Sequence, residues 1–166
     1  MSGCRPARGF DTVRDMRERV TEANLGTMWE PNGPDAVLVS NDLGRTALAL
    51  RPHFDDLDQR CLVLVWTGAQ FASIGAPNDE AISGHRLYDK GLSEIMWAGV
   101  VRESQLVDQL ERQNRVHPAH HSSTYSPLTH HVLPLKEAVI EVVARNLAIQ
   151  RHDGATLDAA VAAVRR

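Results

Sequence analysis

Short apolar segments separated by turn residues are the feature that most constrains the fold of this chain. Residues 36–40 and 45–50 are two such runs, and the Asn-Asp-Leu-Gly sequence at 41–44 is typical of a hairpin connection. Residues 61–66 form a continuous apolar run, as expected of a central strand, with 70–74 as its partner. Because strand and helix patterns do not alternate regularly, the sequence predicts a mainly antiparallel sheet.

The remaining segments predict helices and further strands. Helices are expected at 11–24, 104–114 and 156–166, strands at 95–102 and 130–135, and an irregular stretch at 75–93. The β-branched residues of 139–143 favour a strand pair over 136–150. Helix is the alternative there, because Pro134 and Lys136 would suit the first turn of a helix. The prediction is one α+β domain over 10–166, with two or three helices flanking the sheet, after a disordered segment at 1–9.

Composition excludes some classes of function. The 166 residues suit one domain, and the net charge of −3 argues against a nucleic-acid binder driven by bulk charge. No apolar stretch approaches the roughly 18 residues that span a bilayer. Cys4 and Cys61 match no zinc or redox spacing, and the amino terminus lacks the apolar part of a signal peptide. We therefore expect a reducing compartment, the cytoplasm, no membrane insertion and no nucleic-acid partner.

A glycine-punctuated loop carries the densest set of polar side chains. Within nine positions it contains Asn78, Asp79, Glu80, His85 and Arg86. A histidine near a carboxylate is the usual basis of acid–base catalysis, because the carboxylate orients the ring and raises its pKa. The alternative is an ordinary turn in which Asp79 caps backbone amides and Arg86 pairs with Glu80 at the surface.

A second set of charged residues lies in the apolar segment that follows. If this segment is strand, Lys136 and Glu137 lie on opposite faces, and Glu137 shares a face with Glu141. A carboxylate between Ile140 and Val142 is costly to bury unless it is paired, so Glu141 faces either water or a partner. A buried Glu141 would be a candidate base with a raised pKa.

Histidines are concentrated between positions 117 and 131. A metal site for zinc or another divalent ion would use His117, His120, His121 and His131. Adjacent residues on a strand point to opposite faces, so only one of His130 and His131 can face a given pocket. The alternative is a solvated loop rich in His, Ser and Pro. The sequence implies no other cofactor.

Three segments have residue patterns that are typical of family motifs: APNDEAISGHRLYDKGL (76–92), LERQNRVHP (110–118) and LTHHVLPLKEAVIEVVA (128–144). They resemble segments of a family of small bacterial proteins, chiefly from GC-rich genomes. The resemblance covers roughly the C-terminal two thirds of the chain. It implies no particular activity, but it implies that the three segments belong to one unit.

These residues favour a small protein with one polar pocket, where the loop at 78–86 meets the strands at 131–141. An acid–base enzyme (a lyase, isomerase, cyclase or hydrolase) would bind a small molecule there. Its catalytic residues would be His85 or His131 for proton transfer, with Asp79, Glu80 and Glu141 as partner acids. Its ligand-binding residues would be Asn78, Arg86, Lys136 and Glu137. The alternatives are a non-catalytic accessory protein that binds a ligand or a protein, and the metal protein described above. Sheet edges would also allow a homodimer.

Overall fold

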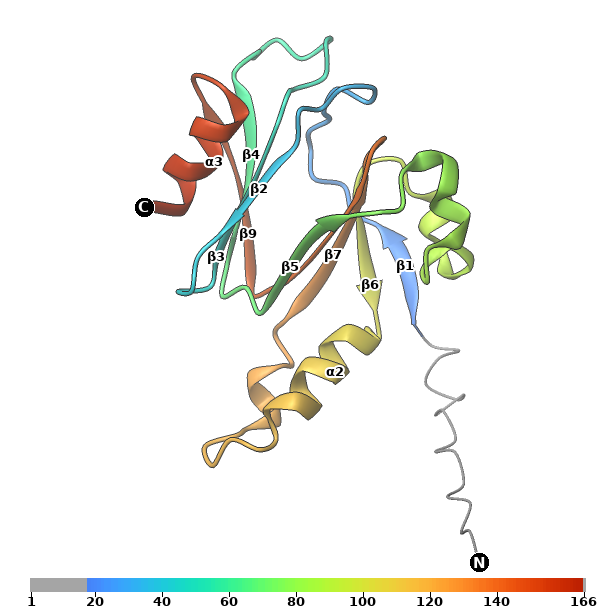
Figure 1. The fold of residues 1–166 in the computed structure, drawn as a ribbon, viewed down its shortest axis with the longest axis vertical. Coiled ribbons are helices and arrows are strands. Elements are labelled where there is room, and N and C mark those ends of the chain that lie inside the picture. Colours follow the sequence, from blue (N-terminus) through green and yellow to red (C-terminus); the bar gives the residue numbers. More distant parts are fainter. Residues whose placement is uncertain (1–17, 166) are drawn as a thin grey trace, which may run out of the picture.

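Two antiparallel sheets pack face to face in the computed structural model, which describes residues 18–165 (Figure 1). The five-stranded sheet has the order β1 (Arg19–Glu22), β6 (Gly99–Arg102), β7 (Thr129–Pro134), β8 (Val139–Ala144) and β5 (Phe71–Gly75). The four-stranded sheet has the order β2 (Val37–Ser40), β3 (Arg45–Leu50), β4 (Cys61–Thr67) and β9 (Asn146–His152).

The main core lies between the two sheets. Alternate residues of each strand point inward, so Leu48 and Leu64 of one sheet meet Leu133 and Ile140 of the other. A second apolar layer covers the other face of the four-stranded sheet, where helix α3 (Thr156–Arg165) packs small alanines against Val63 and neighbouring residues. This layering explains why β3 and β4 read as continuous apolar runs, since both of their faces are covered.

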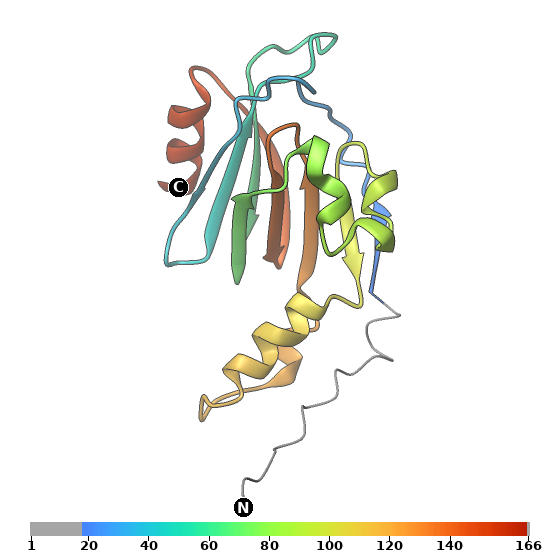
Figure 2. The same ribbon diagram turned by 45° about the vertical axis from the view of Figure 1, so that its right-hand side comes forward.

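Three short 3-10 helices cover the outer face of the five-stranded sheet (Figure 2). They are η1 (Asp79–Gly84), η2 (Tyr88–Lys90) and η3 (Leu92–Glu94). Leu87 and Leu92 of this segment, which we call the 3-10 cover, pack against Val101 and Val132 of the sheet. Side chains on this outer face are closely packed at Gly99 of β6, where an added Cβ would lie 2.5 Å from Cγ1 of Val20 on the neighbouring strand β1.

Helix α2 (Gln105–Asn114) and the short helix η4 (Ser122–Thr124) form the connection from β6 to β7. They project from one end of the five-stranded sheet, away from the body of the sandwich (Figures 1 and 2). Ser104 caps α2, with its Oγ accepting a hydrogen bond from the Val107 N–H at 3.3 Å. The end of this sheet is therefore the place where a helix terminus and two strands meet.

The α+β class with a mainly antiparallel sheet is confirmed, as are the hairpin at 41–44 and strand rather than helix after 136. Strands β8 and β9 do not pair with each other, because they belong to different sheets. The expected pairing of 61–66 with 70–74 is wrong, because β5 pairs with β8 in the other sheet. The expected strand at 95–102 is shorter and begins at Gly99. The expected helix at 11–24 is wrong for the described residues 18–24, because Val20 there belongs to strand β1, which pairs with β6. Residues 11–17 of that helix and the segment 1–9 lie outside the described residues. No helix among residues 18–165 is long and apolar enough to cross a membrane.

Candidate active site

A network of contacting polar side chains crosses the outer face of the five-stranded sheet beneath the 3-10 cover. On β7 and β8 the pairing of Val132 with Glu141, and of His130 with Val143, places His130 and Glu141 on this same face. His130 Nε2 lies 2.9 Å from Glu141 Oε2. His130 Nε2 has no hydrogen bond of good geometry among the described residues, so the two groups make a close polar contact. The side chain of His130 is completely buried.

Ser104 contacts the other nitrogen of the same ring. Its Oγ lies 2.7 Å from His130 Nδ1. Because Oγ already accepts from Val107 N–H, the hydroxyl proton is available to be donated to Nδ1. In the tautomer that accepts this proton at Nδ1, the ring N–H is at Nε2, which faces Glu141. Ser104 follows Glu103, which has a φ of +50°, so the serine stands at a tight turn between strand β6 and helix α2.

Glu141 is held by three basic side chains. Besides His130, its carboxylate contacts His85 Nε2 at 3.6 Å and forms an ion pair with Arg86. Burial by itself would raise the pKa of Glu141, but the contacts with His130 and His85 and the charge of Arg86 outweigh burial and hold the pKa well below its usual range. Glu141 is therefore an anion at neutral pH. The prediction of a raised pKa, suited to a general base, is wrong.

Glu18 is the second carboxylate of this polar network. Its side chain is 0% exposed and pairs with Arg86 at 3.3 Å and Lys90 at 3.0 Å. It also accepts a hydrogen bond at 2.9 Å from the backbone N–H of Gln105, the first residue of α2. Arg86 thus bridges Glu18 and Glu141, and Glu18 ties the 3-10 cover to the start of α2.

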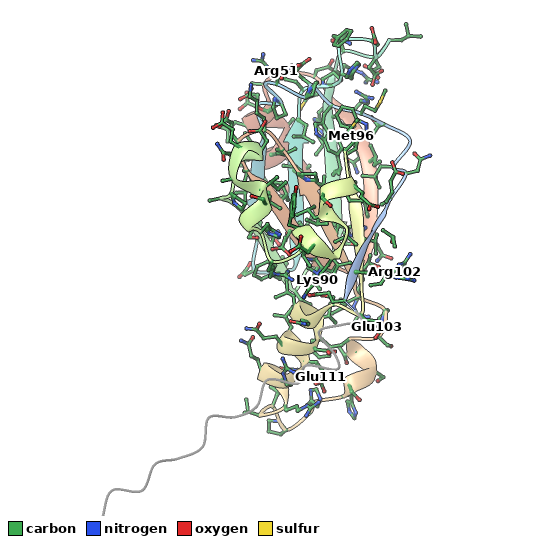
Figure 3. The ribbon with its side chains drawn as sticks, turned by 90° about the vertical axis from the view of Figure 1, so that its right-hand side faces the viewer. Arg51, Lys90, Met96, Arg102, Glu103 and Glu111 are labelled. Atoms are coloured by element: carbon green, nitrogen blue, oxygen red, sulfur yellow. The ribbon has the colours of Figure 1, made fainter. Side chains whose placement is uncertain are left out.

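An open pocket of about 620 Å³ gives access to one end of this polar network. Ser104 and His130 both line it, at the junction of β6, β7 and α2. Its walls combine charged and apolar side chains, among them Val107, Glu111, Arg112, Tyr125 and Leu128. Figure 3 shows Arg102, Glu103 and Glu111 along this part of the molecule. The pocket is of a size that suits a small molecule.

The predicted meeting of the loop at 78–86 with β8 is present, through His85 and Arg86. The other loop residues do not join this site. Asn78 caps η1, with its side chain accepting from the Ala81 N–H at 3.2 Å, and Asp79 and Glu80 are exposed in the first turn of η1. The expected surface pair of Arg86 with Glu80 is not formed in the described residues, because Arg86 is taken up by Glu18 and Glu141.

Lys136 and Glu137 also lie away from Glu141. Both are exposed in the turn between β7 and β8, which is closed by a hydrogen bond from Leu135 N–H to Ala138 C=O. Strand β8 begins only at Val139, so the strand register that would have aligned Glu137 with Glu141 does not extend to Glu137.

His131 points into the core between the sheets, so its expected position beside His85 and Glu141 is wrong. Its Nδ1 accepts a hydrogen bond at 3.3 Å from Trp66 Nε1–H. Burial, together with the neighbouring His130, lowers the pKa of His131 from 6.5 to about 4. His131 is therefore a neutral core residue at pH 7. His130, and not His131, is the neighbouring histidine that contacts Glu141.

The proposed metal ligands are not assembled. His117 and His121 are exposed in the connection after α2, and His120 Nε2 pairs with Glu111 at 2.9 Å. His131 lies apart from them between the sheets. Among residues 18–165 no three His, Cys, Asp or Glu side chains are placed to share a metal ion.

Sequence reasoning missed Ser104, His130 and Glu18 as members of the site. A serine at the start of a helical segment is a local signal for a helix cap, and adjacent histidines on a strand must point to opposite faces. Nothing in the local sequence says which face the 3-10 cover will occupy. No feature of the sequence marks Glu18, since its partners lie 68 and 72 positions away. Comparison of the chain with protein-family models, curated proteins and solved structures finds no match.

Proposed function

We propose that the protein is a small hydrolase that uses Ser104 as a nucleophile against an activated acyl group, such as an ester. The observation that carries the proposal is the sequence of contacts from Ser104 Oγ to His130 (2.7 Å) and from His130 to Glu141 (2.9 Å), with Ser104 lining an open pocket. A nucleophile, a base that contacts it and an anion that contacts the base form the arrangement needed for nucleophilic catalysis.

The first half-reaction transfers the acyl group to the enzyme. Ser104 Oγ bonds to the acyl carbon while its proton moves to His130 Nδ1, and His130 then returns that proton to the departing alcohol oxygen. In the second half, water gives a proton to His130 as its oxygen bonds to the acyl carbon. The Ser104 oxygen leaves and recovers the proton from His130, and the acid product is released.

Two charges support this chemistry. The ionised carboxylate of Glu141 stabilises the positive charge that His130 carries between the two proton transfers. The amino terminus of α2 begins directly after Ser104, and the N–H of Leu106 in its first turn has no acceptor within the helix. This end of the helix favours the negative charge that develops on the acyl oxygen.

The proposal includes a small-molecule substrate and a cytoplasmic location. A polar and apolar lining with arginines at its walls suits a compound that has both an apolar group and polar atoms. The buried free thiol of Cys61 agrees with a reducing compartment. Pairing through a free sheet edge, such as β1 or β9, would give a homodimer.

A binding protein without chemistry is the second candidate, and one observation favours it. Ser104 has a structural role as the cap of α2, and the fully buried His130 could serve only to satisfy Ser104 and Glu141. In that case the pocket would bind a ligand, and the polar network beneath it would stabilise the fold.

The two candidates are separated by removing the hydroxyl while keeping the cap. Ser104→Asn retains a side-chain oxygen that can cap α2, whereas Ser104→Ala removes both cap and nucleophile. We expect hydrolysis of short-chain p-nitrophenyl esters, and labelling of Ser104 by a fluorophosphonate probe, to be lost in both variants and in His130→Gln. Ser126→Ala, which changes another serine of the same pocket, should retain both signals. Absence of labelling in the wild type, or full activity in Ser104→Asn, would refute catalysis by Ser104.

A further inference from the structure

A second pocket lies at the opposite end of the five-stranded sheet from Ser104. The pocket lined by Ser104 adjoins Thr129 at the start of β7, whereas this cleft adjoins Pro134 at its end. It has a volume of about 540 Å³ and is bordered by the 3-10 cover, the β7–β8 turn and the segment around Met96, which Figure 3 labels. We call it the aromatic cleft.

Rings and other apolar side chains form most of its lining, which includes Trp29, Tyr88, Leu92, Ile95, Met96 and Trp97. Trp97 meets Trp29 edge to face at 5.4 Å between ring centres and meets His53 edge to face at 6.1 Å. Trp97 is partly exposed and Met96 is 72% exposed, although both are large apolar side chains. Rings that are fixed in this way and partly open to solvent suit a flat apolar group.

Two opposite charges stand at one edge of the cleft. Asp79 and Lys136 both line it, and their backbones are joined by a hydrogen bond at 2.8 Å from Asp79 N–H to Lys136 C=O. Within residues 18–165 neither the Asp79 carboxylate nor the Lys136 ammonium forms an ion pair, with each other or with another side chain. The cleft thus offers one cation and one anion beside a wall of aromatic side chains.

We propose that the aromatic cleft binds a zwitterion of the α-amino acid class that carries an aromatic side chain. The ligand ammonium pairs with Asp79, its carboxylate pairs with Lys136, and its ring lies against Trp97 and Met96. A ligand with a single charge leaves one of the two groups without a partner, and a ligand without a ring leaves the apolar wall uncovered. This site is separate from Ser104 and does not depend on the proposed hydrolase activity.

The test measures binding of L-phenylalanine by tryptophan fluorescence with excitation at 295 nm, where the probe does not absorb. Two of the three tryptophans, Trp29 and Trp97, line the cleft, and Trp66 is buried in the core. The comparison compounds are 3-phenylpropionate, which lacks the ammonium, 2-phenylethylamine, which lacks the carboxylate, and glycine, which lacks the ring. We expect a saturable change with L-phenylalanine. Binding of 3-phenylpropionate and 2-phenylethylamine should be weaker by at least about tenfold, since each lacks one of the two charged contacts. Glycine should also bind more weakly by at least about tenfold, because it leaves the apolar wall uncovered.

Variants that remove one charge at a time test the two proposed contacts separately. Lys136→Met should bind L-phenylalanine no more tightly than it binds 2-phenylethylamine, and Asp79→Asn should bind it no more tightly than 3-phenylpropionate. Glu137→Gln is the matched control, because it removes an exposed charge from the same turn and does not line the cleft. The proposal is overturned if L-phenylalanine gives no saturable change, if the comparison compounds bind equally well, or if the two charge variants bind like Glu137→Gln.

Discussion

The buried, neutral His131 should make the stability of this protein fall on mild acidification. Its pKa is lowered from 6.5 to about 4 because the side chain is enclosed between the sheets. An unfolded chain therefore takes up a proton at this position at a higher pH than the folded chain does. The stabilisation is fully present above pH 6.5 and is lost as the pH falls toward about 4.

The size of the effect follows from the two pKa values. At about 1.36 kcal/mol for each pKa unit, a fall from 6.5 to about 4 corresponds to a loss of about 3 kcal/mol. A domain of this size typically has a stability of about 5–15 kcal/mol, so the loss should be easy to measure. The relevant quantity is the free energy of unfolding, obtained from urea titrations at a series of pH values between 4 and 8.

The matched variant is His131→Gln, which does not titrate and still offers Trp66 an acceptor. It should be less stable than the wild type at pH 7, because the core is disturbed, but its stability should depend less on pH between 6.5 and 4. Other titrating groups contribute equally to both proteins, so the difference between the two curves isolates His131. Parallel curves over this range, or an NMR titration in which His131 is protonated near pH 6.5, would refute the reasoning.

Three further predictions concern the packing around the candidate site. Glu141→Gln should lower the free energy of unfolding by about 3 kcal/mol at pH 7, as measured by urea titration, because it leaves the bases around it without their anion; a loss below about 1 kcal/mol would contradict the buried ion pair. Ser104→Ala should cost about 1 kcal/mol in the same assay through loss of the helix cap, whereas Ser104→Asn should cost clearly less, and equal losses would argue against the cap. Gly99→Ala should lower the melting temperature, with a cost of about 1–3 kcal/mol from crowding against Val20, and wild-type stability in this variant would show that the Val20 side chain can shift.

The sheet architecture could be predicted because its signals are local. The turn sequence at 41–44 between two apolar runs specifies a hairpin, and the β-branched residues of 139–143 favour strand over helix. The capping of α2 by Ser104 is local in the same sense, because an N-cap serine bonds to a backbone N–H three residues ahead. The helix expected at 11–24 was wrong at Val20, because the four residues of an edge strand carry too little alternation to be recognised in the sequence.

The candidate site was only partly predictable. The polar loop at 78–86 contains His85 and Arg86, which contact Glu141, and the cost of burying Glu141 implied that it has a partner. The direction of the pKa change of Glu141 was wrong, because it depends on three basic groups that come from two distant segments of the chain. A sequence shows that a carboxylate is costly to bury, but not which charges surround it.

By itself, the sequence determined that this chain forms antiparallel strands with two faces, and that His130 and His131 must point in opposite directions. Only the tertiary structure decided which face lies against the second sheet and which lies under the 3-10 cover. That choice made His131 a neutral core residue and placed His130 between Ser104 and Glu141. The physical reason is that an alternating pattern fixes the period of a strand, whereas the identity of each face depends on the layers packed against it.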